Sequence, residues 1–203
     1  MIAVVDYGLG NLHSVTKAVE QVSGGREVCV TEDPVVVDRA ERVVLPGVGA
    51  FGDTMGGLDQ RGMVPALRRV FESGRPFLGI CMGMQALFSA SEESPGVEGL
   101  GVFPGTLRRF ENRPGLKVPH MGWNALSFPQ PCPLFQGLGD GAHVYFVHSY
   151  LADLSQPEIV AAESKHGIRF AAAVAKPPIF GTQFHPEKSQ RVGLQILENF
   201  VSL

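Results

Sequence analysis

The sequence predicts an α/β fold, in which an open and mostly parallel central sheet is flanked by helices and extended by antiparallel strands in the second half. Two observations support this prediction. Over residues 1–90, short apolar runs alternate with amphipathic stretches, a pattern typical of a parallel sheet covered by helices on both faces. Over residues 107–185, strand-like runs follow one another with turns between them, which indicates mixed or antiparallel additions to the same sheet.

The first half begins with a buried strand, "IAVVD" at 2–6, followed by a glycine turn and a helix from about Asn11 to Val22. Apolar runs at 27–31 and 42–46 predict two further strands, and "MVPALRRVFESG" at 63–74 predicts a helix that ends at Gly74. A strand at 76–80, "PFLGI", then leads through Cys81 into a helix expected over 82–90.

The second half contains strand-like runs and a closing helix. The runs lie at 107–110, 142–152, 158–164, 169–175 and 179–185, and the helix is expected over 191–200. Because the 203 residues contain no internal repeat, low-complexity tract or credible linker, we expect one domain over residues 1–203.

Composition narrows the classes of function. The formal net charge of −3 gives no basic surface for a nucleic acid, and no apolar run is long enough for a membrane helix. Asp6 comes too early for a signal peptide. The three cysteines, Cys29, Cys81 and Cys132, are widely spaced and form no C-x-x-C motif. We therefore expect no disulfide framework, no metal site and a cytoplasmic protein.

The stretch "GICMGMQ" at 79–85 carries the first candidate chemistry. A cysteine between a strand and a helix, with Gly79 and Gly83 at the G-x-C-x-G spacing, is similar to the nucleophile elbow of hydrolases. Glycines at those positions leave room for a sharp turn, and the helix amino terminus favours a thiolate. The alternative is a cysteine that simply packs in the core. The motif favours a nucleophilic Cys81.

A nucleophilic cysteine needs a base, and His185 is the best candidate among the six histidines. It lies in "GTQFHPEKS", where Pro186 favours an extended backbone at His185. In an extended segment Glu187 would share a face with His185 and could orient its imidazole. A solvated turn is the alternative. Metal binding by His143 and His148 is disfavoured, because their odd spacing directs them to opposite faces of a strand.

Acyl transfer also needs hydrogen-bond donors for an oxyanion. The stretch "LPGVGAFGD" at 45–53 follows a predicted strand, and its glycines could direct backbone N–H groups into a cleft; a plain glycine loop is the alternative. The amino-terminal "DYGLGN" has G-x-G, but His13 occupies the third glycine position of a dinucleotide fingerprint. No P-loop is present. We therefore expect no nucleotide and no other cofactor.

Together these stretches resemble the triad-type (class I) glutamine amidotransferases, which carry a G-x-C-x-G-x-Q elbow and a later H-P-E. Within that family, "DYGLGNLHSV", "LPGVGAFGD", "GICMGMQ", "VPHMGWN", "YFVHSY" and "GTQFHPEKS" are similar to the glutaminase subunits of imidazole glycerol phosphate synthases, from histidine biosynthesis. The markers run from residue 6 to residue 189, nearly the whole chain. The resemblance implies an open, flavodoxin-like sheet.

The resemblance also implies a mechanism and a set of site residues. Cys81 would attack the side-chain amide of L-glutamine, His185 would relay the proton and Glu187 would hold His185. Oxyanion stabilisation is expected from Gly47, Val48, Gly49 and the N–H of Met82. The resemblance implies that the loop needs a peptide flip before its N–H points inward, so that the enzyme would be idle until the partner is loaded. Glutamine would be held by Gln85, Glu98 and the backbone of His148, Ser149 and Tyr150.

The implied partner is a cyclase subunit with a (β/α)8 barrel, which would receive ammonia through the protein in a heterodimer. The expected interface residues are His120, Met121, Trp123 and Lys188; a core position is the alternative for Trp123. Two other functions remain open on this scaffold. One is a free-standing gamma-glutamyl hydrolase or cysteine peptidase, and the other is a redox sensor or chaperone-like protein, which would not need His185 and Glu187.

Overall fold

The structure, a computed structural model, describes residues 1–112, 114–153 and 155–203. The strands of its central sheet are β1 (Ile2–Val5), β2 (Val28–Thr31), β3 (Arg42–Leu45), β4 (Phe77–Ile80), β10 (Val160–His166), β11 (Ile168–Lys176) and β12 (Ile179–Thr182). They form a seven-stranded sheet in the order β10–β11–β12–β4–β3–β1–β2. From β12 to β2 all neighbours are parallel, whereas β10 and β11 add antiparallel pairs at one edge. The predicted fold class is confirmed.

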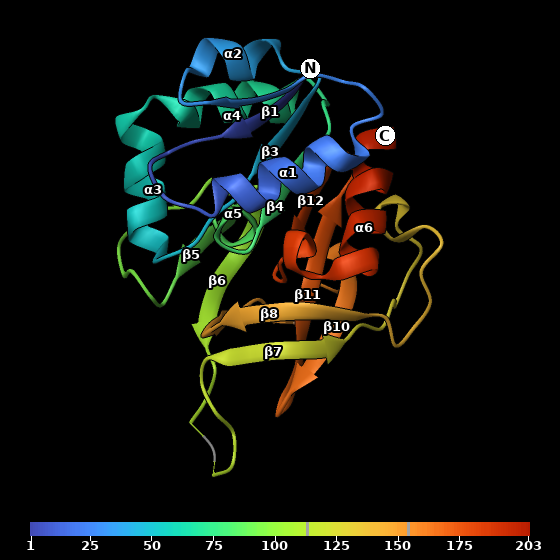
Figure 1. Cartoon of the computed structure of the whole chain (residues 1–203). Helices are drawn as coiled ribbons and strands as arrows, with labels where there is room; N and C mark the ends of the chain where they lie inside the picture. Colours follow the sequence, from blue (N-terminus) through green and yellow to red (C-terminus); the bar gives the residue numbers. More distant parts are fainter. Residues whose placement is uncertain (113, 154) are drawn as a thin grey trace.

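Helices and two small sheets surround this centre (Figure 1). The helices are α1 (Leu12–Val22), α2 (Pro34–Arg39), α3 (Phe51–Gln60), α4 (Met63–Glu72), α5 (Met82–Gln85) and α6 (Gln190–Ser202). One small sheet contains β5 (Phe88–Ser91), β6 (Phe103–Arg109) and β9 (Tyr150–Leu151), and the other pairs β7 (His120–Ala125) with β8 (His143–His148). In Figure 1 the β7–β8 pair crosses the ends of β10 and β11.

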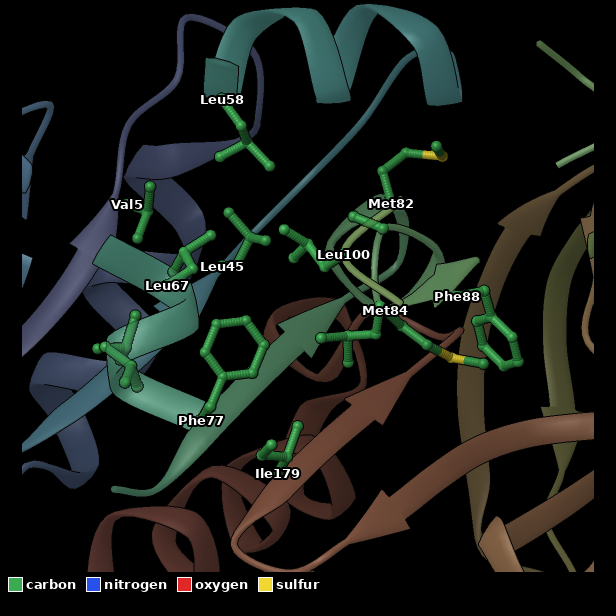
Figure 2. Close-up of a cluster of buried hydrophobic side chains, with 14 of the residues drawn as sticks. Val5, Leu45, Leu58, Leu67, Phe77, Met82, Met84, Phe88, Leu100 and Ile179 are labelled. Atoms are coloured by element: carbon green, nitrogen blue, oxygen red, sulfur yellow. The ribbon is translucent and has the colours of Figure 1, made fainter. Parts of the chain in front are cut away.

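Both faces of the central sheet are buried, because alternate strand residues point into two separate cores. On β1, Ile2 and Val4 pack in the core that includes residues of α1 and α6. Ala3 and Val5 pack in the opposite core, with residues of α2, α3 and α4. Figure 2 shows part of this second core, where Met82 and Met84 of α5 lie among the apolar side chains. The short helix after Cys81 is therefore anchored by its side chains.

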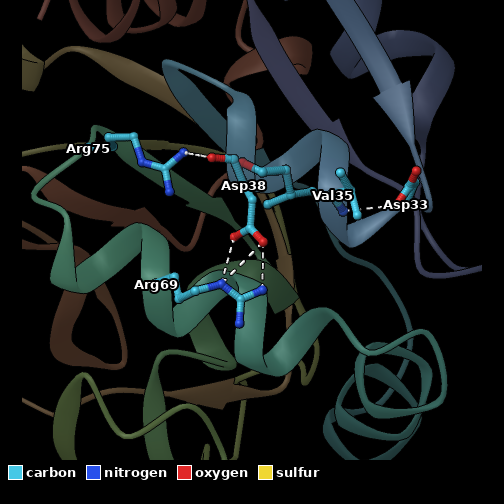
Figure 3. Close-up of polar contacts among 6 residues, drawn as sticks. Asp33, Val35, Asp38, Arg69 and Arg75 are labelled. Atoms are coloured by element: carbon cyan, nitrogen blue, oxygen red, sulfur yellow. Dashed lines mark hydrogen bonds and ion pairs between the residues drawn. The ribbon is translucent and has the colours of Figure 1, made fainter.

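On the outer side of that core, α2 and α4 are joined by a charged contact (Figure 3). Arg69 Nη2 lies 2.6 Å from Asp38 Oδ2, and this guanidinium lowers the pKa of the Asp38 carboxyl. Arg75 Nη1 donates to the backbone oxygens of Asp38 and Ala40, both at 2.8 Å. Because the ion pair is exposed, its contribution to stability is modest, about 0.2–1 kcal/mol.

The structure differs from the predictions at three helices. The helix expected over 82–90 ends at Gln85, and β5 follows, because Phe88 and Ala90 pair with β6. Helix α2 was not predicted, although Asp33 caps it by accepting the Val35 N–H at 2.8 Å. Helix α3 was not predicted either, because its glycines disfavour a helix in isolation.

Other strand limits differ as well. The run at 142–152 divides at Ser149 into β8 and β9, and β6 begins at Phe103 rather than at 107. Strand β7 was not predicted. Within the part of the chain that the structure describes, no helix is both long enough and apolar enough to cross a membrane.

Candidate active site

Cys81 lies in a sharp turn between β4 and α5, at the carboxyl edge of the parallel sheet. Its backbone has φ +53°, a left-handed conformation that non-glycine residues rarely adopt. The turn is held by the Cys81 N–H, which donates to the Thr182 carbonyl at 2.7 Å. Such strain at the end of a strand is typical of a nucleophile elbow.

The two glycines of the elbow lie where a side chain does not fit. A Cβ on Gly79 would lie 2.4 Å from the Gly83 carbonyl oxygen, and one on Gly83 would lie 1.9 Å from the Leu45 carbonyl oxygen. The close approach of α5 to β3 and β4 therefore requires glycine at both positions. This agrees with the sequence argument that Gly79 and Gly83 make room for the turn at Cys81.

His185 and Glu187 form a buried pair beside the elbow. His185 Nδ1 lies 2.8 Å from Glu187 Oε1, and both side chains are almost fully buried. The segment was expected to be extended, but only His185 is; Pro186–Lys188 forms a 3₁₀ turn, and this turn directs Glu187 back to the imidazole. The backbone N–H of His185 donates to the backbone carbonyl of Tyr145 at 2.9 Å, which ties the pair to β8.

The charged form of His185 is favoured at neutral pH. Burial opposes the imidazolium, but the adjacent Cys81 thiol and the Glu187 carboxylate outweigh burial and raise the pKa of His185 to about 9. His185 Nε2 is buried and has no hydrogen-bond partner among the described residues. The nitrogen opposite Glu187 is therefore available to the cysteine or to a substrate.

A cavity of about 290 Å³ brings most of the expected site residues together. It is lined by Val48, Gly49, Cys81, Met82, Gln85, Glu93, Pro119, Val147, His148, Ser149, Tyr150 and His185. Glu187 lies behind His185 and does not line it. The residues come from the segments that follow β3, β4, β5 and β12, from the start of β7 and from the junction of β8 and β9, so they are far apart in sequence. The size and lining suit one small polar substrate.

Gly47 lies beneath this cavity and does not line it. A Cβ at Gly47 would lie 2.6 Å from Met82 Cβ and 2.7 Å from the Tyr7 hydroxyl. Burial raises the pKa of Tyr7 to about 12, so its hydroxyl stays protonated. The loop of Gly47, Val48 and Gly49 is thus packed tightly against the elbow, with Gly49 at φ +92°. Close contact requires glycine at Gly47, whereas at Gly49 an added Cβ would meet only Leu9 Cδ1 at 4.0 Å, and the positive φ is what favours glycine there.

Gln183 contributes a contact to Cys81 that sequence reasoning missed. Its Nε2 donates to Cys81 Sγ at 3.8 Å, and its Oε1 accepts from Gln85 Nε2 at 3.0 Å. Gln183 is two residues before His185, so strand alternation could have indicated that both lie on the side of Cys81. Within the described residues Gln85 Oε1 is buried without a partner, which leaves it free to accept a hydrogen bond from a ligand.

The expectation for Glu98 does not agree with the structure. Glu98 is exposed and does not line the cavity, whereas Glu93 does. Glu93 Oε2 accepts the Phe51 N–H at 2.8 Å, at the start of α3. This long-range bond holds the Glu93 carboxylate at the cavity, and no local pattern reveals it.

The four residues expected at an interface separate into two groups. Met121 is 63% exposed and Trp123 48% exposed, so Trp123 is not a core residue. Lys188 is exposed, with its Nζ 5.9 Å from the centroid of the Tyr145 ring. His120 is only 4% exposed. It alternates with Met121 on β7 and faces inward. The expectation that His120 lies at the interface is therefore wrong.

Comparison with known proteins places this geometry in a family. Residues 3–203 match the family described as Glutamine amidotransferase class-I. The chain belongs to the class I glutamine amidotransferases. Proteins named "Imidazole glycerol phosphate synthase subunit HisH" are similar over nearly the full length: that of Geobacter metallireducens is 55% identical over 98% of this chain and 96% of its own. That of Moorella thermoacetica is 50% identical over 100% and 94%.

Solved structures show the same fold at low sequence identity. A structure titled "Crystal structure of glutamine amidotransferase" has a TM-score of 0.76 at 18% identity and covers 100% of both chains. A chain of PurLQS from Thermotoga maritima has a TM-score of 0.75 at 20% identity, covering 99% of this chain and 97% of its own. The enzyme class expected from the elbow and H-P-E is confirmed, and the free-standing hydrolase is not favoured by these relatives.

The other two cysteines lie away from the candidate active site. Cys29 and Cys132 are free and half-buried, and burial raises the pKa of the Cys132 thiol. Neither lines the cavity of this glutamine amidotransferase. Within residues 1–112, 114–153 and 155–203, no group of three or more His, Cys, Asp and Glu side chains could hold a metal ion.

Proposed function

We propose that residues 1–203 form one glutaminase domain, which hydrolyses L-glutamine with the triad Cys81, His185 and Glu187 and delivers the ammonia to a cyclase subunit. The observation that carries this proposal is the shared cavity of Cys81 and His185, with His185 held by Glu187 at 2.8 Å. A nucleophile, a base and a group that orients the base are the three parts that covalent acyl transfer requires.

The reaction follows from these groups. His185, which is charged at neutral pH, already holds the proton that the Cys81 thiol gives up, and Cys81 Sγ attacks the side-chain carbonyl carbon of glutamine to form a tetrahedral oxyanion. When the C–N bond breaks, the proton passes from His185 to the nitrogen, which leaves as ammonia, and a thioester remains. Water then attacks the thioester, His185 accepts its proton, and glutamate departs as the thiol is restored.

The oxyanion is assigned to backbone donors of the elbow and the glycine loop. The Met82 N–H lies at the amino terminus of α5, and Val48 and Gly49 line the same cavity. Preorganised backbone donors of this kind contribute about 10²–10³-fold to such reactions. A peptide flip in this loop, triggered by the partner, would switch the enzyme on.

Glutamine would be held by groups around the cavity. Gln85 Oε1 is a free buried acceptor, and Glu93 supplies a carboxylate; both suit the α-amino group of an amino acid. We assign this role to Glu93 in place of Glu98. His148, Ser149 and Tyr150 also line the cavity, and their backbone would hold another part of the substrate.

The partner is proposed from the relatives, which are named as subunits of imidazole glycerol phosphate synthase. We infer that this chain pairs with the cyclase subunit, a (β/α)8 barrel, and that ammonia reaches it through the protein. The exposed Met121 and Trp123 suit such an interface, since aromatic and methionine side chains are enriched there. Lys188 is also exposed and is retained as a proposed contact. The free cysteines suit the reducing cytoplasm, where we expect the complex to work.

The test is glutamine hydrolysis by the purified chain, alone and with the cyclase subunit and its nucleotide ligand. We expect little activity alone, strong stimulation in the complex and no activity in Cys81→Ala. The same variant complex should still use added ammonium salt, which bypasses the glutaminase. Full activity without the partner would instead support a free-standing hydrolase, and activity in Cys81→Ala would exclude the proposed nucleophile.

A further inference from the structure

Two buried histidines outside the triad are bonded to each other. His120 on β7 is paired in register with His148 at the end of β8, and His120 Nδ1 lies 3.0 Å from His148 Nε2. Both rings are buried, next to Phe110, Phe146 and Phe170. When both rings are neutral, one ring donates and the other accepts in the bond between them. Which ring donates follows from the partners of the other two ring nitrogens, His120 Nε2 and His148 Nδ1.

Asn124 determines the direction at the first end. Its Oδ1 accepts the Ala125 N–H at 2.9 Å, and its Nδ2 donates to the Lys165 carbonyl at 2.9 Å. These two bonds fix the orientation of the amide. The Asn124 Nδ2 that lies 3.1 Å from His120 Nε2 is therefore a donor, so His120 Nε2 accepts and a neutral His120 carries its proton on Nδ1.

The Tyr150 carbonyl determines the direction at the second end. His148 Nδ1 lies 2.7 Å from this oxygen, which can only accept. A neutral His148 therefore carries its proton on Nδ1, and its Nε2 accepts from His120. The two ends give the same direction independently. Burial lowers the pKa of His120 to about 4 and that of His148 to about 3, so both rings are neutral near pH 7.

The chain of bonds runs from the outer sheet to the active-site cavity. Tyr150 lines the cavity, and its carbonyl also accepts from Gln85 Nε2 at 3.4 Å. At the other end, β7 exposes Met121 and Trp123 on the face opposite His120. The buried bonds thus connect the strand that carries the exposed residues with the wall that faces Cys81.

We propose that Asn124, His120 and His148 form a histidine relay, a set of positioning residues that holds the Tyr150 carbonyl and thereby orients glutamine in the cavity. The part of this inference that concerns glutamine rests on the proposed function. The protonation pattern does not, since it follows from the hydrogen bonds alone. These residues touch one another and the wall of the site, and they take no part in bond making.

The first measurement reads the tautomers of the histidine rings in the full chain by two-bond ¹H–¹⁵N correlation at pH 7. We expect His120 and His148 both to be neutral Nδ1–H tautomers. An Nε2–H tautomer or a charged ring at either position would overturn the relay. This experiment needs no substrate and no variant, so it is independent of the glutaminase reaction.

The second measurement compares two variants of similar size in the complex with the cyclase. An asparagine at position 120 has an amide N–H group close to the position of the His120 Nδ1–H and can donate to His148 Nε2, whereas a leucine has no donor there. His120→Leu should raise the KM for glutamine about five- to tenfold, the effect of one lost hydrogen bond, with kcat nearly unchanged. The KM for glutamine of His120→Asn should lie close to that of wild type, because the hydrogen bond to His148 is kept.

A control separates packing from hydrogen bonding. His166 stacks on His120 with ring centroids 4.2 Å apart, but its Nε2 bonds to the Lys117 carbonyl and lies outside the relay. His166→Leu should leave the KM unchanged. Equal KM values for His120→Leu and His120→Asn would refute a positioning role. If wild type shows no glutaminase activity while the tautomers are as expected, the proposed function and the role in orienting glutamine fail, and only the protonation pattern stands.

Discussion

Gly83→Ala provides a strong test of the elbow geometry. Gly83 lies in α5, and an added Cβ would be 1.9 Å from the carbonyl oxygen of Leu45, the last residue of β3. Because real Cβ atoms essentially never come within 3.0 Å of such an atom, α5 must retreat by about 1 Å in a close-packed core. The obstacle is backbone, so it cannot rotate away.

The magnitude follows from two opposing effects. Overpacking of this kind destabilises by about 1–3 kcal/mol or more, whereas alanine is favoured over glycine in a helix by about 1 kcal/mol. A clash with backbone belongs at the upper end, so we expect a net loss of about 2 kcal/mol. Retreat of α5 also displaces Cys81 and the Met82 N–H, and a misplacement of about 1 Å reduces the rate about 100-fold.

Gly56→Ala is the matched control. Gly56 lies inside α3, and an added Cβ there would have nothing within 4 Å, so this substitution should stabilise by about 0.5–1 kcal/mol. Urea unfolding followed by circular dichroism measures both variants, and glutaminase activity with the cyclase measures the site. If Gly83→Ala were as stable and as active as Gly56→Ala, the reasoning about close packing at the elbow would be refuted.

Three other predictions concern the site and its surface. Glu187→Gln should lower the pKa of His185 from about 9 toward 6.5, which an NMR titration would measure. In the wild type, the charged ring contributes stability that is complete below pH 6.5 and is lost as pH rises through 9. This contribution should decrease in the variant, so its free energy of unfolding at pH 6 should be lower. Glu93→Gln should raise the KM for glutamine at least tenfold while Glu98→Gln leaves it unchanged, because only Glu93 lines the cavity; the reverse order would contradict the assignment. Trp123→Ala should weaken cyclase binding by about 2 kcal/mol without changing the unfolding midpoint, and unchanged calorimetric affinity would exclude it from the interface.

Local patterns were sufficient for the sheet and for the elbow that carries the candidate nucleophile. Strands such as β1 and β4 are buried on both faces, so continuous apolar runs identify them. The elbow is equally local, since a strained turn at Cys81 needs glycines two residues to either side. The pairing of His185 with Glu187 was also predicted, although a 3₁₀ turn and not an extended strand brings them together.

Long-range contacts explain what the sequence did not reveal. Helix α3 forms in spite of its glycines because Glu93 and Ser94 accept its first N–H groups from 42 residues away. The same bond decides that Glu93, and not Glu98, reaches the cavity. His120 was assigned to the surface with Met121 and Trp123, because strand β7 and its alternation were not foreseen.

The sequence by itself determined the class of fold, the position of the candidate nucleophile and the residue types of the proposed triad, because each depends on neighbours within a few residues. Tertiary structure alone decided which carboxylate lines the cavity, that Gln183 contacts Cys81, and how Asn124, His120 and His148 order their protons. Those outcomes depend on hydrogen bonds between segments far apart in the chain, and local sequence patterns carry no information about which distant partner a buried polar group will meet.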